Sequence, residues 1–220
     1  MNDEKLYQVA LKFIHGIGDI NAKQLISYCG SAKAIFNNSK SKLQRIPGIG
    51  IKTIESILSS QVLQNAEKEI EKCLAANVDL LFYTDAGYPS RLKLVNDSPI
   101  ILFSNGNINF NKQKVVGIVG TRKATEYGKS VTESIVKDLV PHGAIIVSGL
   151  AYGIDITAHR AALDNNLPTV AVLAGGLDKI YPVVHKKYTV DLMENGAIVS
   201  EKFLGTTPEA HFFPARNRII

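Results

Sequence analysis

The sequence predicts an α/β protein in which a mainly parallel sheet follows a small all-helical domain. From residue 113 onward, short apolar runs alternate with stretches of helical periodicity, a pattern typical of parallel strands joined by helices. In the first 60 residues apolar positions recur only at helical spacing. A length of 220 residues and a hydrophobic content of 45% allow a sizeable core. We therefore expect two domains, 1–66 and 67–220, the second beginning with a connector.

The helical domain contains the tripeptide Gly-Ile-Gly twice, at residues 16–18 and 48–50, each time between two short predicted helices. Helices are expected over about 5–14, 21–29, 31–36 and 53–58, with Gly30 ending the second and Ser31 capping the third. The arrangement resembles the tandem helix-hairpin-helix motif of DNA-binding proteins, in a SAM-like domain. Glycine has no Cβ atom, so the backbone of such a turn can approach a phosphate closely.

The second hairpin is the stronger candidate for a DNA contact, through Gly48, Gly50 and the cation Lys52. The first hairpin carries Asp19 and Ile20 after its turn, and a carboxylate repels phosphate. The alternative is a sterile-alpha-type helical bundle whose glycine turns make no contact with DNA.

The connector is predicted to begin with an amphipathic helix over 62–81. Strands over 79–83 and 98–103 and an Asn-rich loop over 106–112 follow. In the sheet proper, strands are expected over 115–119, 144–148, 169–173 and 197–200. Helices over 125–140, 154–164 and 185–194 should cover both faces. The apolar run Val115–Val119, closed by glycine, predicts a strand buried on both faces.

The turns that follow the predicted strands form a candidate site, because ligands of such sheets bind at the carboxyl ends of the strands. These turns contain Gly120, Thr121, Arg122 and Lys123, then Ser148 and Gly149, then Gly175 and Gly176, and finally Lys202 and Phe203. Small residues leave room for a ligand, a guanidinium suits phosphate, and the helix capped by Thr125 favours an anion at its N-terminus. We therefore expect a polyanion site, with ordinary turn chemistry as the alternative. Only Gly117 and Gly120 fit the dinucleotide fingerprint, so no NAD site is expected.

Five ordered motifs from Gly117 onward carry a resemblance to a known family. They are GIVGTRKATEYG, IIVSGLAYGIDITAHRAAL, VLAGGLDKIYP, IVSEKFLGTTP and FFPARNRII. Over residues 67–220 the chain resembles the DNA-processing protein A family (DprA, also called Smf). That resemblance implies a Rossmann-like domain, without catalytic activity or cofactor, in a cytoplasmic bacterial protein. Such proteins bind single-stranded DNA and load the recombinase RecA onto it in natural transformation.

The resemblance also assigns residues. It implies that Arg122 contacts phosphate, that Gly149, Gly175 and Gly176 line the same groove, and that Lys202 and Phe203 lie near it. The segment Arg216, Asn217 and Arg218 matches a stretch near the DNA pocket. Phe203 or Tyr127 would stack on a base. Members of the family continue beyond the position of Ile220, so we expect a fragment. A homodimer and the RecA contacts are then properties of the full-length protein.

An enzyme is the alternative class. Asp155 and His159 stand four residues apart on one predicted helix, with Asp178 and Tyr181 after the glycine turn. No third ligand follows at a metal spacing, and no nucleophile with an adjacent base or phosphate-binding P-loop is legible. The G-G-x-G-T-x-x-E signature of nucleotide phosphoribohydrolases is broken at residues 175–179. We therefore expect no metal and no catalysis, with a nucleotide-binding module or a phosphoribohydrolase-like enzyme as alternatives.

Charge and composition bear on the partner and on the class of protein. The net charge is +5, and residues 1–66 hold eight lysines and arginines against four acidic residues. This excess points to a polyanion partner there, with an ordinary lysine-rich surface as the alternative. Cys29 and Cys73 lack metal-ligand spacing and should lie in helices. The polar, acidic start predicts no signal peptide, and no apolar run approaches the roughly 18 residues of a membrane span.

Overall fold

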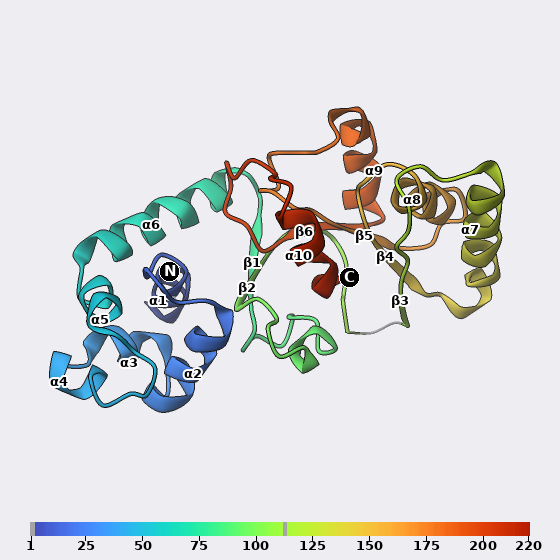
Figure 1. Ribbon diagram of the computed structural model, residues 1–220. Coiled ribbons are helices and arrows are strands. Elements are labelled where there is room, and N and C mark those ends of the chain that lie inside the picture. Colours follow the sequence, from blue (N-terminus) through green and yellow to red (C-terminus); the bar gives the residue numbers. More distant parts are fainter. Residues whose placement is uncertain (1–2, 112–113) are drawn as a thin grey trace. The chain divides into compact units, whose positions relative to one another are not determined.

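The computed structural model describes residues 3–111 and 114–220 (Figure 1). Its contacts group the chain into two compact units. The first comprises the described residues of Met1–Asn77 with Lys93–Ile101, and the second Val78–Leu92 with the described residues of Leu102–Ile220. The division at residue 66, as a boundary between independently folding domains, stays a prediction. Residue 112, the last of the predicted Asn-rich loop, lies outside the described residues.

The first unit is helical in its described part. Its helices are α1 (Asp3–Leu11), α2 (Asp19–Cys29), α3 (Ala32–Asn37), α4 (Lys40–Leu43), α5 (Ile51–Ile57) and α6 (Ser60–Ala75). The predicted boundaries around Gly30 are confirmed: Gly30 has the left-handed φ of 88°, and its N–H donates to the Ile26 carbonyl at 2.7 Å. Ser31 caps α3 by accepting the Ala34 N–H at 3.0 Å. Cys29 and Cys73 lie in α2 and α6, as predicted.

The predicted helix over 62–81 is wrong at its end. α6 stops at Ala75, and Asn77 adopts a left-handed φ of 51° that turns the chain out of the helix. Strand β1 (Asp79–Phe82) then begins. The core of the first unit is formed where α1 packs against α3 and α6. Its fully buried side chains include Leu11, Leu25, Ile35, Leu43, Ile54 and Ile57.

The second unit contains a six-stranded sheet in the order β1-β2-β6-β5-β4-β3. The remaining strands are β2 (Ile101–Gly106), β3 (Val115–Gly117), β4 (Ile145–Gly149), β5 (Thr169–Val172) and β6 (Gly196–Ser200). β3, β4, β5 and β6 pair in parallel, with Val116 opposite Ile146 and Val147 opposite Val170. The predicted parallel sheet is therefore confirmed. β2 pairs antiparallel with β6, and it begins later than predicted because the Ile100 N–H donates to the Asp19 carboxylate instead.

The crossover helices are α7 (Glu126–Asp138), α8 (Ile154–Asp164) and α9 (Thr189–Glu194), the last preceded by a 3₁₀ segment, Val183–Tyr188, where α-helix was predicted. α7 contacts α8 and α8 contacts α9, so the three form one layer, with α7 and α8 side by side in Figure 1. The prediction that these helices cover both faces of the sheet is therefore wrong. The chain passes from β3 through β4 and β5 to β6 in one direction along the sheet, and right-handed crossovers in one direction place their helices on the same face. Val116 and Ile118 pack into the core between this layer and the sheet. Gly117 alternates with them and faces the other side, where Ile220 at the end of α10 (Phe212–Arg216) and its 3₁₀ extension lies.

The prediction that Val115–Val119 is a strand buried on both faces is wrong. β3 covers only its first three residues, none of them buried, and Val119 is 58% exposed. The physical reason is position: among the described strands, β3 lies at the edge of the sheet and pairs only with β4. None of the helices in the described part of the chain combines the length and hydrophobicity needed to cross a bilayer.

Candidate nucleic-acid interface

The turn after β3 is held by one backbone hydrogen bond to the start of α8 and by one hydrogen bond within the turn. The Thr121 carbonyl accepts the Ile154 N–H at 3.2 Å, and the Thr121 hydroxyl accepts the Lys123 N–H at 3.2 Å. Thr125 caps α7 as predicted, accepting the Gly128 N–H at 3.1 Å. Thr121 is thus used to hold the turn, while Arg122 and Lys123 are exposed.

The strand-end glycines make room for the chain itself, not for a ligand. A Cβ on Gly120 would lie 2.5 Å from Ile154, one on Gly175 would lie 2.7 Å from Pro208, and one on Gly176 would lie 2.5 Å from the Phe203 carbonyl oxygen. A Cβ on Gly149 would overlap the guanidinium of Arg216. The expectation that these glycines leave open space for a ligand is therefore corrected: the segment 203–216 and α8 occupy that space.

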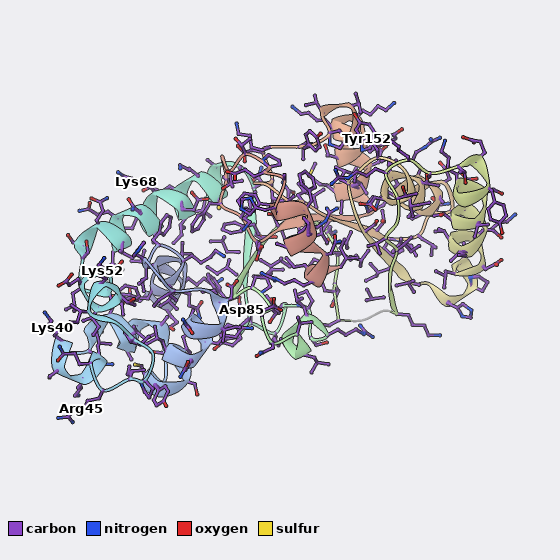
Figure 2. All side chains as sticks on the ribbon, viewed as in Figure 1. Lys40, Arg45, Lys52, Lys68, Asp85 and Tyr152 are labelled. Atoms are coloured by element: carbon purple, nitrogen blue, oxygen red, sulfur yellow. The ribbon has the colours of Figure 1, made fainter. Side chains whose placement is uncertain are left out.

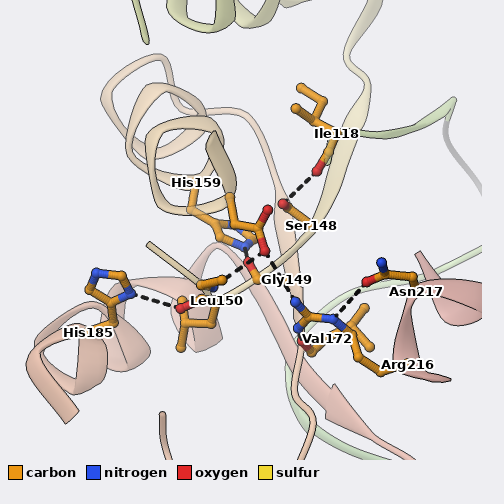
Figure 3. Close-up of polar contacts among 11 residues, drawn as sticks. Ile118, Ser148, Gly149, Leu150, His159, Val172, His185, Arg216 and Asn217 are labelled. Carbon is orange, nitrogen blue, oxygen red and sulfur yellow. Dashed lines mark hydrogen bonds and ion pairs between the residues drawn. The ribbon is translucent and has the colours of Figure 1, made fainter. Parts of the chain in front are cut away.

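Arg216 is a buried crosslink between strand ends (Figure 3). It is 5% exposed, forms an ion pair with Asp155 at 3.2 Å and donates to the Val172 carbonyl. Its Nε donates to the Asn217 side chain at 3.2 Å. Burial raises the pKa of the Asp155 carboxyl, and the positive charge of Arg216 opposes that shift. The sequence places Arg216 near the DNA pocket as a nucleic-acid-binding residue, whereas in the structure its guanidinium is taken up by internal partners.

A second group of buried hydrogen bonds lies near the carboxyl end of β4. Ser148, fully buried, donates to the Ile118 carbonyl at 2.6 Å, so it faces the sheet and not a ligand. His159 is also fully buried, with Nε2 2.7 Å from the Gly149 carbonyl oxygen and Nδ1 2.7 Å from the Thr169 hydroxyl. Burial lowers the pKa of His159 to about 4, so the imidazole is neutral at pH 7. His159 and Asp155 have separate partners here, which disfavours an acid–base pair.

The segment after β6 uses its charges internally. Glu201, 4% exposed, forms ion pairs with Arg218 and, at 3.4 Å, with Lys202. Phe203 packs edge-on against the core ring of Phe103, with 5.7 Å between centroids. Lys202, Phe203 and Arg218 therefore stabilise the loop, and none of them lines the hollow described next.

A hollow of about 230 Å³ lies at the carboxyl ends of β3 and β4. It is lined by Val119, Gly120, Arg122, Ala151, Asp155, Ala210, Phe213, Pro214, Arg216 and Asn217. The Arg122 guanidinium lies 4.9 Å from the centroid of the Phe213 ring, a cation–π contact. Two arginines against one carboxylate give the lining a net positive charge. We call this the Arg122 hollow.

Of the residues predicted at this edge, Gly120, Arg122, Arg216 and Asn217 line the Arg122 hollow, whereas Gly175 lines a neighbouring one. Phe213 is not among the site residues predicted from the sequence. It could have been predicted, because Phe213 belongs to the motif FFPARNRII, of which only Arg216, Asn217 and Arg218 are assigned to the site.

The second helix-hairpin-helix turn presents an open, cationic surface. Gly48 has a left-handed φ of 80°, Gly50 precedes α5, and a Cβ on either glycine would meet no atom within 4 Å. Four cations around α4 and α5 are exposed and take part in no ion pair within the described chain. They are Lys40, Lys42, Arg45 and Lys52, and Figure 2 labels three of them at this end of the unit.

Residues of the first hairpin form contacts with other residues of the first unit. The Asp19 carboxylate accepts the Ile100 N–H at 3.0 Å and lies 3.9 Å from the Lys12 ammonium. The Thr53 hydroxyl donates to the His15 carbonyl at 3.4 Å, which joins the two hairpins. In the part of the chain that the structure describes, no three His, Cys, Asp or Glu side chains gather as a metal site would require.

Comparison with known proteins matches two parts of the chain to two different families. The profile of the family described as DNA recombination-mediator protein A matches residues 79–220, and that of the SAM-like helix-hairpin-helix tandem matches residues 9–60. Protein Smf of a Synechocystis species is 35% identical over all of this chain and 56% of its own length. DNA processing protein DprA of Bacillus subtilis is 40% identical over 60% of this chain and 45% of its own.

Two solved structures resemble this one. The X-ray structure of DNA processing protein A from Streptococcus pneumoniae matches all of this chain and 74% of its own, at 26% identity and a TM-score of 0.71. The same protein from Helicobacter pylori, described with a single-stranded DNA binding mode, matches 65% of this chain and 64% of its own, at 33% identity and a TM-score of 0.58. The α/β, Rossmann-like fold is thereby confirmed. The chain spans about half the length of the curated relatives it matches.

Proposed function

The chain belongs to the DNA recombination-mediator protein A family, and from that premise we propose that it binds single-stranded DNA at the Arg122 hollow. The observation that carries the proposal is the pairing of an exposed arginine with an aromatic ring in a hollow of positive charge. Single-strand binders combine cations that track the backbone with rings on which bases stack. The described binding mode of the Helicobacter pylori relative supports the same ligand.

In this mechanism Arg122 acts as the phosphate clamp. Its planar guanidinium offers parallel donors to two phosphate oxygens, and the Phe213 ring holds it in place. Phosphate contacts carry no sequence information, so binding should be nearly indifferent to base sequence. Rings can stack only on unpaired bases, so binding should be weaker for duplex than for single strands. The site performs no covalent chemistry in this proposal.

Arg122→Ala should weaken binding of oligo-dT by about 1–3 kcal/mol, the range for a charge-assisted hydrogen bond. The slope of the logarithm of the binding constant against the logarithm of the salt concentration should become shallower by about 0.7, the value for one phosphate contact on a single strand. Arg122→Lys should keep most of the salt dependence but recover only part of the affinity. Fluorescence anisotropy across a salt series measures both quantities.

Arg160→Ala is the matched control, because Arg160 is an exposed arginine of α8 that does not line the hollow. It should bind as the wild type does, and circular dichroism checks that both variants are folded. If Arg122→Ala and Arg160→Ala bind alike at every salt concentration, DNA does not lie at this edge of the sheet.

The wider role belongs to the same proposal. We propose that the full-length protein acts in the cytoplasm, forms a homodimer and loads the recombinase RecA onto bound single strands. The family's description as a recombination mediator supports the role in recombination. The test is whether the full-length protein accelerates RecA filament formation on an oligonucleotide, and whether Arg122→Ala removes that acceleration.

The alternative is a phosphoribohydrolase-like enzyme that takes a nucleotide in the same hollow. Incubation with nucleoside monophosphates separates the two: released base would support the enzyme, and a shift with oligo-dT without release supports DNA binding. Two observations favour the second outcome. His159 is buried and does not line the hollow, and the carboxylate of Asp155, which does line it, is engaged in the ion pair with Arg216.

We further propose that the second hairpin contacts the phosphate backbone through Gly48, Gly50 and Lys52. Lys52→Ala should weaken duplex binding alike for every sequence and reduce its salt dependence by about 0.9, the value for one phosphate contact on duplex. Lys68→Ala, which removes an exposed lysine from α6 of the same unit, is the control and should change neither quantity. Equal effects of the two variants would point to diffuse charge and remove the hairpin as a site.

A further inference from the structure

A second, shallow hollow, too tight to admit a water molecule, adjoins the Arg122 hollow at the sheet edge. The two share Ala151, Phe213 and Arg216, so Phe213 stands on the boundary between them. The second is lined in addition by Lys179, Tyr181 and Pro208. We call it the Tyr181 hollow. A ligand that extends from the Arg122 hollow toward Tyr181 must therefore pass the Phe213 ring.

Tyr181 is the exposed aromatic side chain of this second hollow. Its ring centroid lies 5.6 Å from that of Phe213 at an interplanar angle of 66°, and the residue is 51% exposed. An isolated exposed tyrosine is common on protein surfaces and carries no meaning alone. Tyr181 differs because its contact with Phe213 continues to Arg122, 4.9 Å from the same ring. A guanidinium and two rings are thus joined by direct contacts.

That chain of contacts matches the chemistry of a single strand, in which phosphates and flat bases alternate. Other parts of the protein fill the space beside the strand-end glycines, so the ligand has to lie on the exposed side chains and not against the strand ends. Lys179, whose side chain is 48% exposed, adds a cation beside Tyr181, although Asp178 lies 3.9 Å from it.

We propose that Tyr181 is a base-stacking residue, and that the strand runs from the Arg122 hollow past Phe213 and over the exposed ring of Tyr181. This inference rests on the proposed binding of single-stranded DNA. It replaces the two stacking residues expected from the sequence. Phe203 packs against the core ring of Phe103. Tyr127, although 80% exposed, stands on α7 and lines neither hollow.

The test compares oligo-dT with an abasic oligonucleotide of the same length, which has the phosphates but no bases. Tyr181→Leu should weaken oligo-dT binding by roughly 5- to 100-fold, the range for one stacked base. It should leave abasic binding and the salt dependence unchanged, and Tyr181→Phe should bind oligo-dT nearly as the wild type does. Tyr127→Leu is the matched control and should bind both ligands normally.

A second measurement does not depend on the stability of the leucine variant. The chain contains no tryptophan, so Tyr181→Trp places a single indole in the proposed path. Its fluorescence should be quenched by oligo-dT and not by the abasic strand.

The outcomes are distinct. Wild-type affinity for oligo-dT in Tyr181→Leu, an equal loss on both oligonucleotides, or a base-dependent loss in Tyr127→Leu would each overturn the inference while leaving the proposed function intact. Failure of the wild type to bind either oligonucleotide would overturn the proposed function as well.

Discussion

Arg216→Met should lower the free energy of unfolding by about 3–5 kcal/mol, the range for a buried ion pair that loses one partner. Arg216 is 5% exposed and Asp155 is equally buried, so the remaining buried carboxylate would be left without its ion-pair partner. The Val172 carbonyl would lose its donor at the same time. Urea denaturation followed by circular dichroism measures the loss.

Two comparisons make this result specific. Arg160→Met removes an exposed arginine from α8 and should change the stability by no more than about 0.5 kcal/mol. The double variant Asp155→Leu/Arg216→Met removes both charges and should be more stable than Arg216→Met alone. A double variant as unstable as the single one would mean that packing, and not charge, is what Arg216 contributes.

The same variant should respond to pH in a defined direction. Burial already raises the pKa of Asp155, and removing Arg216 takes away the charge that opposes this shift. A carboxyl whose pKa is higher in the folded than in the unfolded protein stabilises the fold at low pH and loses that contribution as the pH rises. The deficit of Arg216→Met should therefore be smaller at pH 5 than at pH 8.

The strands and their parallel pairing could be predicted because they depend on local patterns. An apolar run, a glycine and an amphipathic stretch in succession predict a strand, a turn and a helix. The alternation of such strands and helices predicts a parallel sheet. The caps at Gly30, Ser31 and Thr125 could be predicted for the same reason, since a cap involves residues three or four apart. The position of β3 at the sheet edge could not, because strand order leaves no trace in the run itself.

The allocation of the strand-end residues could not be predicted either. Arg122 and Arg216 are both arginines in motifs of the same family, yet one is exposed in a hollow and the other is buried beneath it. The difference arises from a partner, Asp155, that stands 61 residues away from Arg216 in the chain. The sequence predicts that Gly149 leaves space for a ligand, whereas in the structure the absence of a Cβ atom at Gly149 makes room for the guanidinium of Arg216. Such long-range complementarity is decided by packing.

His159 should make the protein less stable as the pH falls from about 6.5 to about 4. The unfolded chain binds a proton with the ordinary histidine pKa of 6.5, whereas the buried imidazole binds one only near 4. Between these values protonation favours the unfolded state, so the contribution is complete above 6.5 and is lost on acidification. At about 1.4 kcal/mol for each pH unit, the loss reaches about 3 kcal/mol.

His159→Gln isolates this effect from the titration of carboxylates in the same range. A glutamine amide can still donate to the Gly149 carbonyl but takes up no proton. Urea midpoints measured at several pH values between 4 and 8 should fall more steeply with acidification in the wild type than in His159→Gln, with the two curves parallel above pH 6.5. Parallel curves over the whole range would mean that the imidazole accepts its proton in the folded state as readily as in the unfolded one. The bond between His159 and the Gly149 carbonyl would then have to hold the charged form, and the strand end beside the Arg122 hollow would carry a further positive charge in mild acid.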